Sequence, residues 1–198
     1  MNLPNKLTLS RVIMVPFFAA FLLLTPHYSW FKWIAFGIFV IASLTDLLDG
    51  KIARKYNLVT NFGKFMDPLA DKLLVCSALI GMSALSQSLI PAWITMMIIA
   101  REFIISGFRL IAAEKGKVIA ASMWGKWKTT FQMIMLCVKM LVMDTYLPIS
   151  MDSSSVLSVV ERVLRIIGEV TMYIALILTV VSLVDYLIKN KDVLKDVD

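Results

Sequence analysis

Long apolar runs, separated by short polar or proline-containing segments, extend along almost the whole chain. No formally charged residue occurs between Arg11 and Lys32, and a helix of this length spans the hydrocarbon core of a bilayer once. Later runs are comparable and end at polar turns or near prolines such as Pro91. The pattern predicts helices at about residues 9–26, 30–56, 62–85, 91–113, 124–143 and 156–188. We therefore expect an all-α integral membrane protein, a bundle of six transmembrane helices that forms one domain over residues 1–198.

The composition favours the same fold class. Hydrophobic residues make up 59% of the chain and charged residues 17%, whereas soluble domains have about 45–50% and about 25%. This excess of apolar side chains excludes a disordered chain and argues against an ordinary soluble domain. Six spans of about 20 residues each account for most of the 198 residues, so no separate soluble domain is expected.

The basic residues predict how the helices are oriented. The net charge of +6 would suggest nucleic acid for a soluble protein, but short cytoplasmic loops of membrane proteins also collect Lys and Arg. With six spans, 16 of the 20 basic residues fall on one side of the membrane, and only Lys32, Lys139, Arg162 and Arg165 fall toward the other. We expect a multi-pass protein of the cell membrane with both termini in the cytoplasm and no nucleic-acid partner.

Four carboxylates lie where an apolar helix would not need them. Asp46 and Asp49 are three residues apart near the end of one predicted helix, and Asp67 and Asp71 are four apart near the start of the next. Each pair therefore lies on one face of its helix, and the short turn between the helices makes them antiparallel neighbours. Because a carboxylate in hydrocarbon costs several kcal/mol, this cytoplasmic end of the bundle is the predicted functional site.

Four converging carboxylates need compensating charge, because mutual repulsion would otherwise protonate some of them. An all-oxygen ligand set suits hard divalent cations such as Mg²⁺, Mn²⁺ or Ca²⁺. Two such ions about 4 Å apart recur in enzymes that catalyse displacement at phosphorus. Small residues one helical turn from the aspartates, Gly50, Ala53 and Gly63, leave space for close approach, and Arg54 places a guanidinium beside the same groove.

The segment DLLDGKIARKYNLVTNFGKFMDPLAD, residues 46–71, resembles the signature of the CDP-alcohol phosphotransferases, D-x2-D-G-x2-A-R-x8-G-x3-D-x3-D, at all eight fixed positions. Three further segments look like those of the bacterial phosphatidylglycerophosphate synthases within that family. They are NLPNKLTLSR near the N-terminus, REFIISGFR at 101–109 and SMWGKWKT at 122–129. The resemblance therefore extends over nearly the whole chain.

The resemblance implies a homodimeric six-helix membrane enzyme that converts CDP-diacylglycerol and sn-glycerol 3-phosphate to phosphatidylglycerophosphate and CMP, with its active site facing the cytoplasm. It implies two divalent cations, Mg²⁺ or Mn²⁺, held by Asp46, Asp49, Asp67 and Asp71. Asp71 is also the general base in that pattern. Gly50, Ala53, Arg54 and Gly63 match the positions that shape the CDP site.

The acceptor phosphate is a dianion, so its pocket needs Arg or Lys beyond what the metals neutralise. The basic and polar residues near the cytoplasmic ends of the helices are Arg109, Lys126, Arg11, Thr8, Asn5, Arg101 and Lys128. Arg109 and Lys126 are favoured because they lie in the synthase-like segments. For any single one, anchoring the helix end on the cytoplasmic side is an equally good explanation.

Three other functions are compatible with parts of the pattern. Another CDP-alcohol phosphotransferase, such as a phosphatidylinositol phosphate, phosphatidylserine or cardiolipin synthase, shares the signature because the signature serves the common CDP-lipid half. An intramembrane prenyltransferase also uses aspartate-rich helices, but on well-separated helices of a larger bundle. An ion-coupled transporter predicts polar groups at mid-bilayer, and helices one, five and six offer few.

Overall fold

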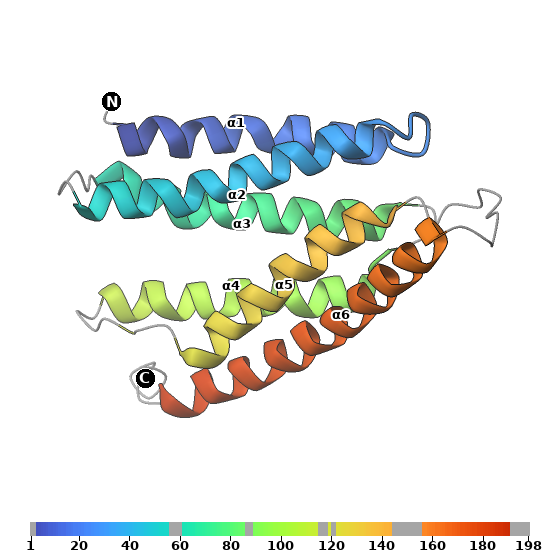
Figure 1. Cartoon of the computed structure of the whole chain (residues 1–198). Coiled ribbons are helices and arrows are strands. Elements are labelled where there is room, and N and C mark those ends of the chain that lie inside the picture. The colour runs from blue at the N-terminus through green and yellow to red at the C-terminus, as the bar shows by residue number, and fades with distance from the viewer. Residues whose placement is uncertain are drawn as a thin grey trace. The chain divides into compact units, whose positions relative to one another are not determined.

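The computed structural model describes residues 3–55, 61–85, 89–114, 119, 122–143 and 156–190. All regular secondary structure in these residues is helical, and short turns or bends connect the helices. The helices are α1 Leu3–Leu24, α2 Phe31–Lys55, α3 Asn61–Ala84, α4 Ala92–Glu114, α5 Met123–Leu141 and α6 Val156–Lys189 (Figure 1). The all-α fold class and the six helices expected from the apolar runs are therefore confirmed.

The start of the first helix was predicted wrongly. It begins at Leu3, not at about residue 9, although every other helix end lies within two residues of its expected position. Pro4 lies in the first turn, where a helix makes no use of the missing N–H. Polar residues such as Asn5 and Thr8 then continue the helix instead of leading into it, because both are buried against protein.

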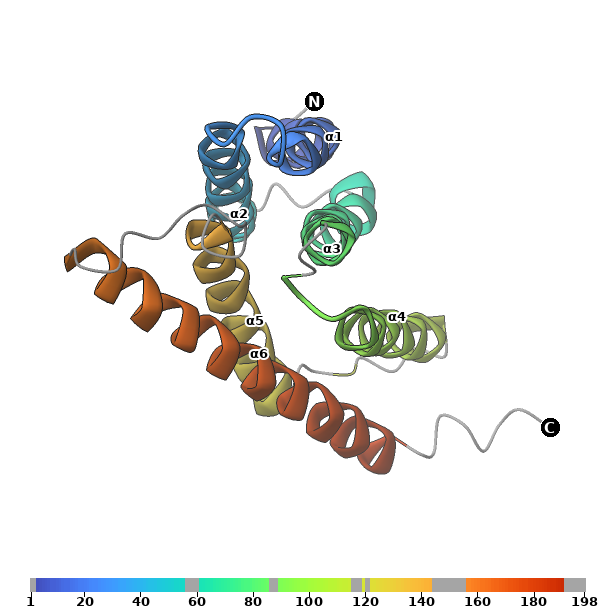
Figure 2. The same ribbon diagram turned by 90° about the vertical axis from the view of Figure 1, so that its right-hand side faces the viewer.

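The first compact unit of the chain comprises residues Met1–Leu89 and Met140–Ser150. It contains the helices α1, α2 and α3. Helix α1 packs against both α2 and α3, and Figure 2 looks nearly along the axes of these three helices. Fully buried aromatic rings join α1 to α2, with Phe18 and Phe39 at 5.7 Å between centroids. Helix α3 approaches α1 at Gly81, where a Cβ would lie only 2.5 Å from Leu22 Cδ2.

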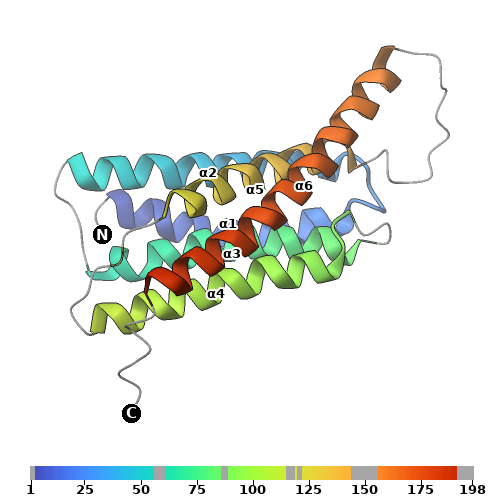
Figure 3. The same ribbon diagram turned by 90° about the horizontal axis from the view of Figure 1, so that it is seen from below.

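The second unit contains α4, α5 and α6, in residues Ile90–Lys139 and Met151–Asp198. The longest helix, α6, runs obliquely past α4 (Figure 3), and the Phe108 ring meets that of Tyr186 edge-on at 6.1 Å. Helix α5 is tied to α6 by an ion pair between Lys139 Nζ and Glu169 Oε1 at 2.7 Å. The two helices approach closely there, since a Cβ on Gly168 would lie 3.3 Å from Lys139 Cγ.

Polar and apolar side chains are distributed in the reverse of a soluble protein. Three of the largest fully buried side chains are cationic, those of Arg11, Lys128 and Lys139. Large apolar side chains are exposed along α6, from Val159 to Ile188. Within the described residues, two segments are long and apolar enough to cross a membrane, Asn5–Leu24 and Val159–Lys189. Apolar exposure on this scale is expected of helices that face lipid or a partner protein.

The close approach of α3 to α1 generates a stability prediction. Gly81→Ala should lower the free energy of unfolding by about 1–3 kcal/mol, because the new methyl group displaces the fully buried Leu22 side chain. Thermal unfolding in detergent would measure the loss.

The matched controls are Gly37→Ala and Gly107→Ala, two helical glycines whose Cβ would meet nothing within 4 Å. Both should leave stability unchanged or raise it by about 0.5–1 kcal/mol, because alanine restricts the unfolded chain. Equal effects at all three glycines would contradict the packing of α1 on α3.

Candidate functional site

The first aspartate of the predicted metal site is paired to an arginine of the neighbouring helix. Arg11 Nη1 on α1 donates to Asp46 Oδ1 on α2 at 2.6 Å. The arginine side chain is buried, whereas the Asp46 side chain is 37% exposed, so Asp46 keeps an accessible edge. Two residues predicted for the acceptor pocket, Thr8 and Asn5, precede Arg11 on α1 at helical spacing and are also buried.

The other three aspartates of the predicted metal site lie on the helices predicted for them. Asp49 is on α2, and Asp67 and Asp71 are on α3, and these two helices contact each other. The Asp71 side chain is exposed. The side chains of Asp49 and Asp67 lie outside the described residues, as do those predicted to shape the CDP site, Gly50, Ala53, Arg54 and Gly63.

A metal site is therefore only partly described. Of the four predicted ligands, the structure describes the side chains of Asp46 and Asp71, and the described residues contain no group of three or more His, Cys, Asp or Glu that would hold a metal ion. The donor chemistry fits Mg²⁺ or Mn²⁺, since every predicted ligand atom is a carboxylate oxygen.

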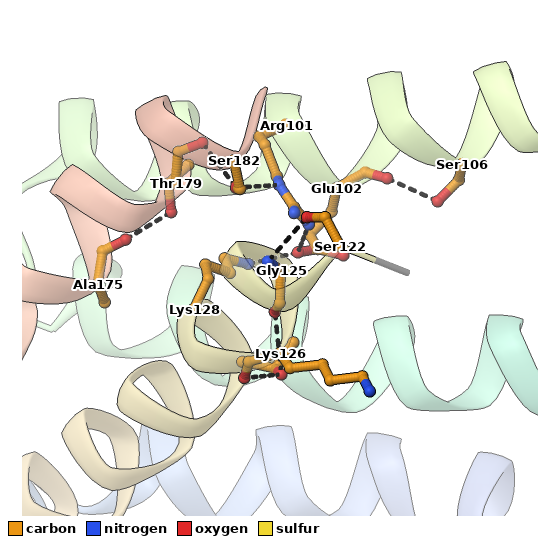
Figure 4. Close-up of polar contacts among 11 residues, drawn as sticks. Arg101, Glu102, Ser106, Ser122, Gly125, Lys126, Lys128, Ala175, Thr179 and Ser182 are labelled. Atoms are coloured by element: carbon orange, nitrogen blue, oxygen red, sulfur yellow. Dashed lines mark hydrogen bonds and ion pairs between the residues drawn. The ribbon is translucent and has the colours of Figure 1, made fainter. Parts of the chain in front are cut away.

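The second unit contains a buried polar cluster centred on Glu102 of α4 (Figure 4). Glu102 Oε1 accepts a hydrogen bond from Arg101 Nη1 at 3.1 Å and a short one from Lys128 Nζ of α5. Arg101 Nε donates to Ser182 Oγ of α6 at 3.1 Å. Glu102 thus links α4 to α5 directly, and Arg101, which Glu102 holds, links α4 to α6. Both cations are almost fully buried, with side chains 8% and 1% exposed.

The N-terminus of α5 beside this cluster has a local cap. Ser122 Oγ accepts a hydrogen bond from the Gly125 N–H at 3.2 Å, which satisfies one of the backbone donors left free at a helix start. The cap fixes where α5 begins and therefore the positions of Lys126 and Lys128 on its first turns. Figure 4 shows the Lys126 side chain extending away from the cluster.

The basic residues predicted for the acceptor pocket separate into two classes. Arg11, Arg101 and Lys128 are buried and already paired with carboxylates. Arg109 and Lys126 are exposed, and neither makes an ion pair within the described part of the chain. Exposed, uncompensated cations are the ones available to an anionic ligand from water.

Glu102 was missed by the sequence analysis, although a signal for it exists. It is an acidic residue in the middle of a predominantly apolar predicted helix, and such residues mark functional or structural polar networks. Glu169 in α6 carries the same signal. The four clustered aspartates are the more conspicuous pattern, and single acids on other helices reveal their partners only in three dimensions.

The chain is similar to known proteins over nearly its whole length. The model of the CDP-alcohol phosphatidyltransferase family matches residues 1–184. A CDP-diacylglycerol–glycerol-3-phosphate 3-phosphatidyltransferase of Bacillus subtilis is 41% identical over 207 residues, covering 98% of this chain and 97% of that protein. The Haemophilus influenzae protein of the same name is 39% identical over 200 residues, 98% and 96% of the two chains. A probable phosphatidylglycerophosphate synthase of Mycobacterium tuberculosis is 39% identical over 186 residues, 93% of this chain and 79% of the relative.

The buried cluster around Glu102 generates a second stability prediction. Glu102→Gln removes the negative charge that compensates Arg101 and Lys128, and leaving buried cations without their carboxylate costs about 3 kcal/mol. For a chain of this size the midpoint of thermal unfolding should fall by about 6–12 °C.

Glu161→Gln is the control, since it neutralises an acid near the start of α6 that lies outside the cluster. Its effect should stay within about 0.5 kcal/mol. Adding Lys128→Met to Glu102→Gln should recover part of the loss, because one uncompensated cation is then removed. If Glu102→Gln unfolded at the wild-type temperature, the contacts of Glu102 with Arg101 and Lys128 would contribute nothing to stability.

Proposed function

Because this chain belongs to the CDP-alcohol phosphatidyltransferase family, we propose that it transfers the phosphatidyl group of CDP-diacylglycerol to sn-glycerol 3-phosphate. The products are phosphatidylglycerophosphate and CMP, and the pathway is phospholipid biosynthesis. The observation that carries the proposal is the full-length similarity to relatives named for this reaction, at 36–41% identity. The family signature at residues 46–71, intact at its eight fixed positions, supports the CDP-lipid half of the reaction.

The aspartates are proposed to hold the metal ions. Asp46, Asp49, Asp67 and Asp71 would hold two divalent cations, Mg²⁺ or Mn²⁺. When bound, such ions neutralise the charge of the diphosphate and of the departing CMP. Arg11 supports this assignment, since its ion pair holds Asp46 Oδ1 while part of the carboxylate stays exposed. Gly50, Ala53, Arg54 and Gly63 are proposed to receive the cytidine diphosphate.

Asp71 is proposed as the general base. Its exposed carboxylate would accept the proton of the C1 hydroxyl of glycerol 3-phosphate as that oxygen attacks the phosphorus bearing diacylglycerol. The new bond joins the C1 oxygen to this phosphorus, and the bond from phosphorus to the oxygen bridging to CMP breaks. The displacement is direct and needs no covalent enzyme intermediate.

The acceptor phosphate is proposed to bind Arg109 and Lys126. Their exposure and the lack of a carboxylate partner among the described residues support this choice. Arg101 and Lys128 are compensated by Glu102, and Arg11 by Asp46, which favours positioning roles for these three cations and for Thr8 on the Arg11 face of α1.

The membrane arrangement belongs to the same proposal. The asymmetry of the basic residues supports six spans with both termini and the active site on the cytoplasmic side. The two long apolar helices and the exposed apolar surface of α6 support insertion in the cell membrane. A homodimer, which the family resemblance implies, and a single functional domain over residues 1–198, which the chain length favours, are part of the proposal.

The purified protein in mixed micelles with CDP-diacylglycerol should form phosphatidylglycerophosphate and CMP when sn-glycerol 3-phosphate is the acceptor. Mass spectrometry would identify the product, and serine, inositol phosphate and phosphatidylglycerol would serve as alternative acceptors. If one of these acceptors gave product and glycerol 3-phosphate gave none, the protein would have a different acceptor specificity within the family. Chelation of divalent cations should abolish turnover, and added Mg²⁺ or Mn²⁺ should restore it.

Asp71→Asn should lower kcat by about 100-fold or more, because a positioned general base contributes about 10²–10⁴. Binding of Mn²⁺, followed by electron paramagnetic resonance at saturating metal, would separate loss of the base from loss of the ion. Near-normal turnover by Asp71→Asn with metal bound would exclude Asp71 as the base.

A further inference from the structure

Tyr186 of α6 carries a buried hydroxyl to which the described residues offer no hydrogen-bond partner. The residue is 3% exposed, and its ring packs edge-on against Phe108 of α4, with 89° between the ring planes. Its hydroxyl oxygen is buried and has no hydrogen-bond partner among the described residues. The ring therefore has a packing role, and the hydroxyl needs a separate explanation.

A phenol in such a place is unfavourable for folding alone. Buried tyrosine hydroxyls normally find a hydrogen-bond partner, and an unsatisfied one costs about 1–3 kcal/mol. Phenylalanine would supply the same contact with Phe108 without that cost. The hydroxyl is thus available to a group other than those of the described residues.

The charges around Tyr186 indicate what kind of group this is. Arg101 Nε donates to Ser182 Oγ at 3.1 Å, and Ser182 lies one helical turn before Tyr186 on α6, so Arg101 meets the face of α6 that carries Tyr186. Glu102 compensates Arg101 and also pairs with Lys128 of α5. On α6, Asp185 pairs with Lys189 at 2.7 Å.

The single carboxylate Glu102 faces both Arg101 and Lys128, so one positive charge is left over in that cluster, and a second is that of Arg109. Arg109 follows Phe108, the residue that contacts the Tyr186 ring, and it is exposed without an ion pair in the described part of the chain. The hydroxyl therefore lies in a region of net positive charge, where an anion is the favoured occupant.

We infer that the Tyr186 hydroxyl donates a hydrogen bond to a phosphate oxygen of the acceptor, the same phosphate that Arg109 binds. The inference rests on the proposed function, because it assigns a further residue to the acceptor site of that reaction. A phenol suits this task, since its rigid ring is held by Phe108 and its hydroxyl donates to an anion without adding charge. The hydrogen bond would help the site to distinguish a phosphorylated acceptor from an uncharged alcohol.

Tyr186→Phe should raise the KM for sn-glycerol 3-phosphate about tenfold, the loss expected for one hydrogen bond to a charged group. The KM for CDP-diacylglycerol should change by less than about twofold, because the lipid substrate does not use this hydroxyl. The inhibition constant of inorganic phosphate, competing with glycerol 3-phosphate, should rise by the same factor as the KM. The midpoint of thermal unfolding should be unchanged or higher, since an unsatisfied buried group has been removed.

Tyr173→Phe is the matched control, because it makes the same chemical change at an exposed tyrosine of the same helix. It should leave both KM values and the phosphate inhibition constant unchanged. Arg109→Gln should raise the KM for glycerol 3-phosphate, and the double variant should lose less than the product of the two single effects, since both residues bind one phosphate.

Three results would overturn the inference. They are an unchanged KM in Tyr186→Phe, a raised KM with an unchanged inhibition constant for inorganic phosphate, and a lowered unfolding midpoint with equal losses toward both substrates. Each of these results is compared with the wild-type protein, which must be active in the same assay. A wild-type protein that makes no phosphatidylglycerophosphate would contradict the proposed function, whereas an active wild type with an unaffected Tyr186→Phe contradicts only the role of Tyr186.

Discussion

The cost of burying charge is the constraint on which this structure depends. A chain with 59% hydrophobic residues has few charged groups, and several of its cations are completely enclosed. An uncompensated ion in a low-dielectric interior costs several kcal/mol. Each of these cations therefore forms an ion pair with a carboxylate of another helix. Arg11 with Asp46, Lys128 with Glu102, and Lys139 with Glu169 are three such pairs. Each pair fixes the axial register of two helices, which apolar packing alone leaves less well defined.

The same constraint divides the basic residues by function. A cation whose charge is already balanced inside the protein contributes to position, and a cation that stays exposed remains available to a ligand. By this criterion Arg101 and Lys128 organise the second unit around Glu102, whereas Arg109 and Lys126 stay exposed and are the two cations proposed for the acceptor phosphate. Buried polar atoms without a partner among the described residues extend this reasoning to neutral groups, and the hydroxyl of Tyr186 is one of them in the second unit.

Much of the fold was predictable because its elements follow from local pattern. Apolar runs bounded by polar turns gave the positions of all six helices, and most ends differ by no more than two residues. The start of α1 differs because Pro4 is compatible with a first helical turn, and because the polar residues Asn5 and Thr8 after it are buried against protein. The candidate site was predictable to the extent that its residues are close in sequence. Asp46 to Asp71 form one signature, whereas Glu102, Lys128 and Ser182 come from three distant segments that have no common motif.

The sequence by itself determined the helices and the family, because each depends on residue type at short, regular spacing. The tertiary structure decided which charges compensate one another, and so which cations are structural and which are available. It also decided which polar atoms remain without a partner, as at Tyr186. The physical reason is that desolvation and pairing depend on neighbours from other helices. A lysine in an apolar run has the same sequence pattern whether its side chain pairs with a carboxylate of another helix or is exposed to water.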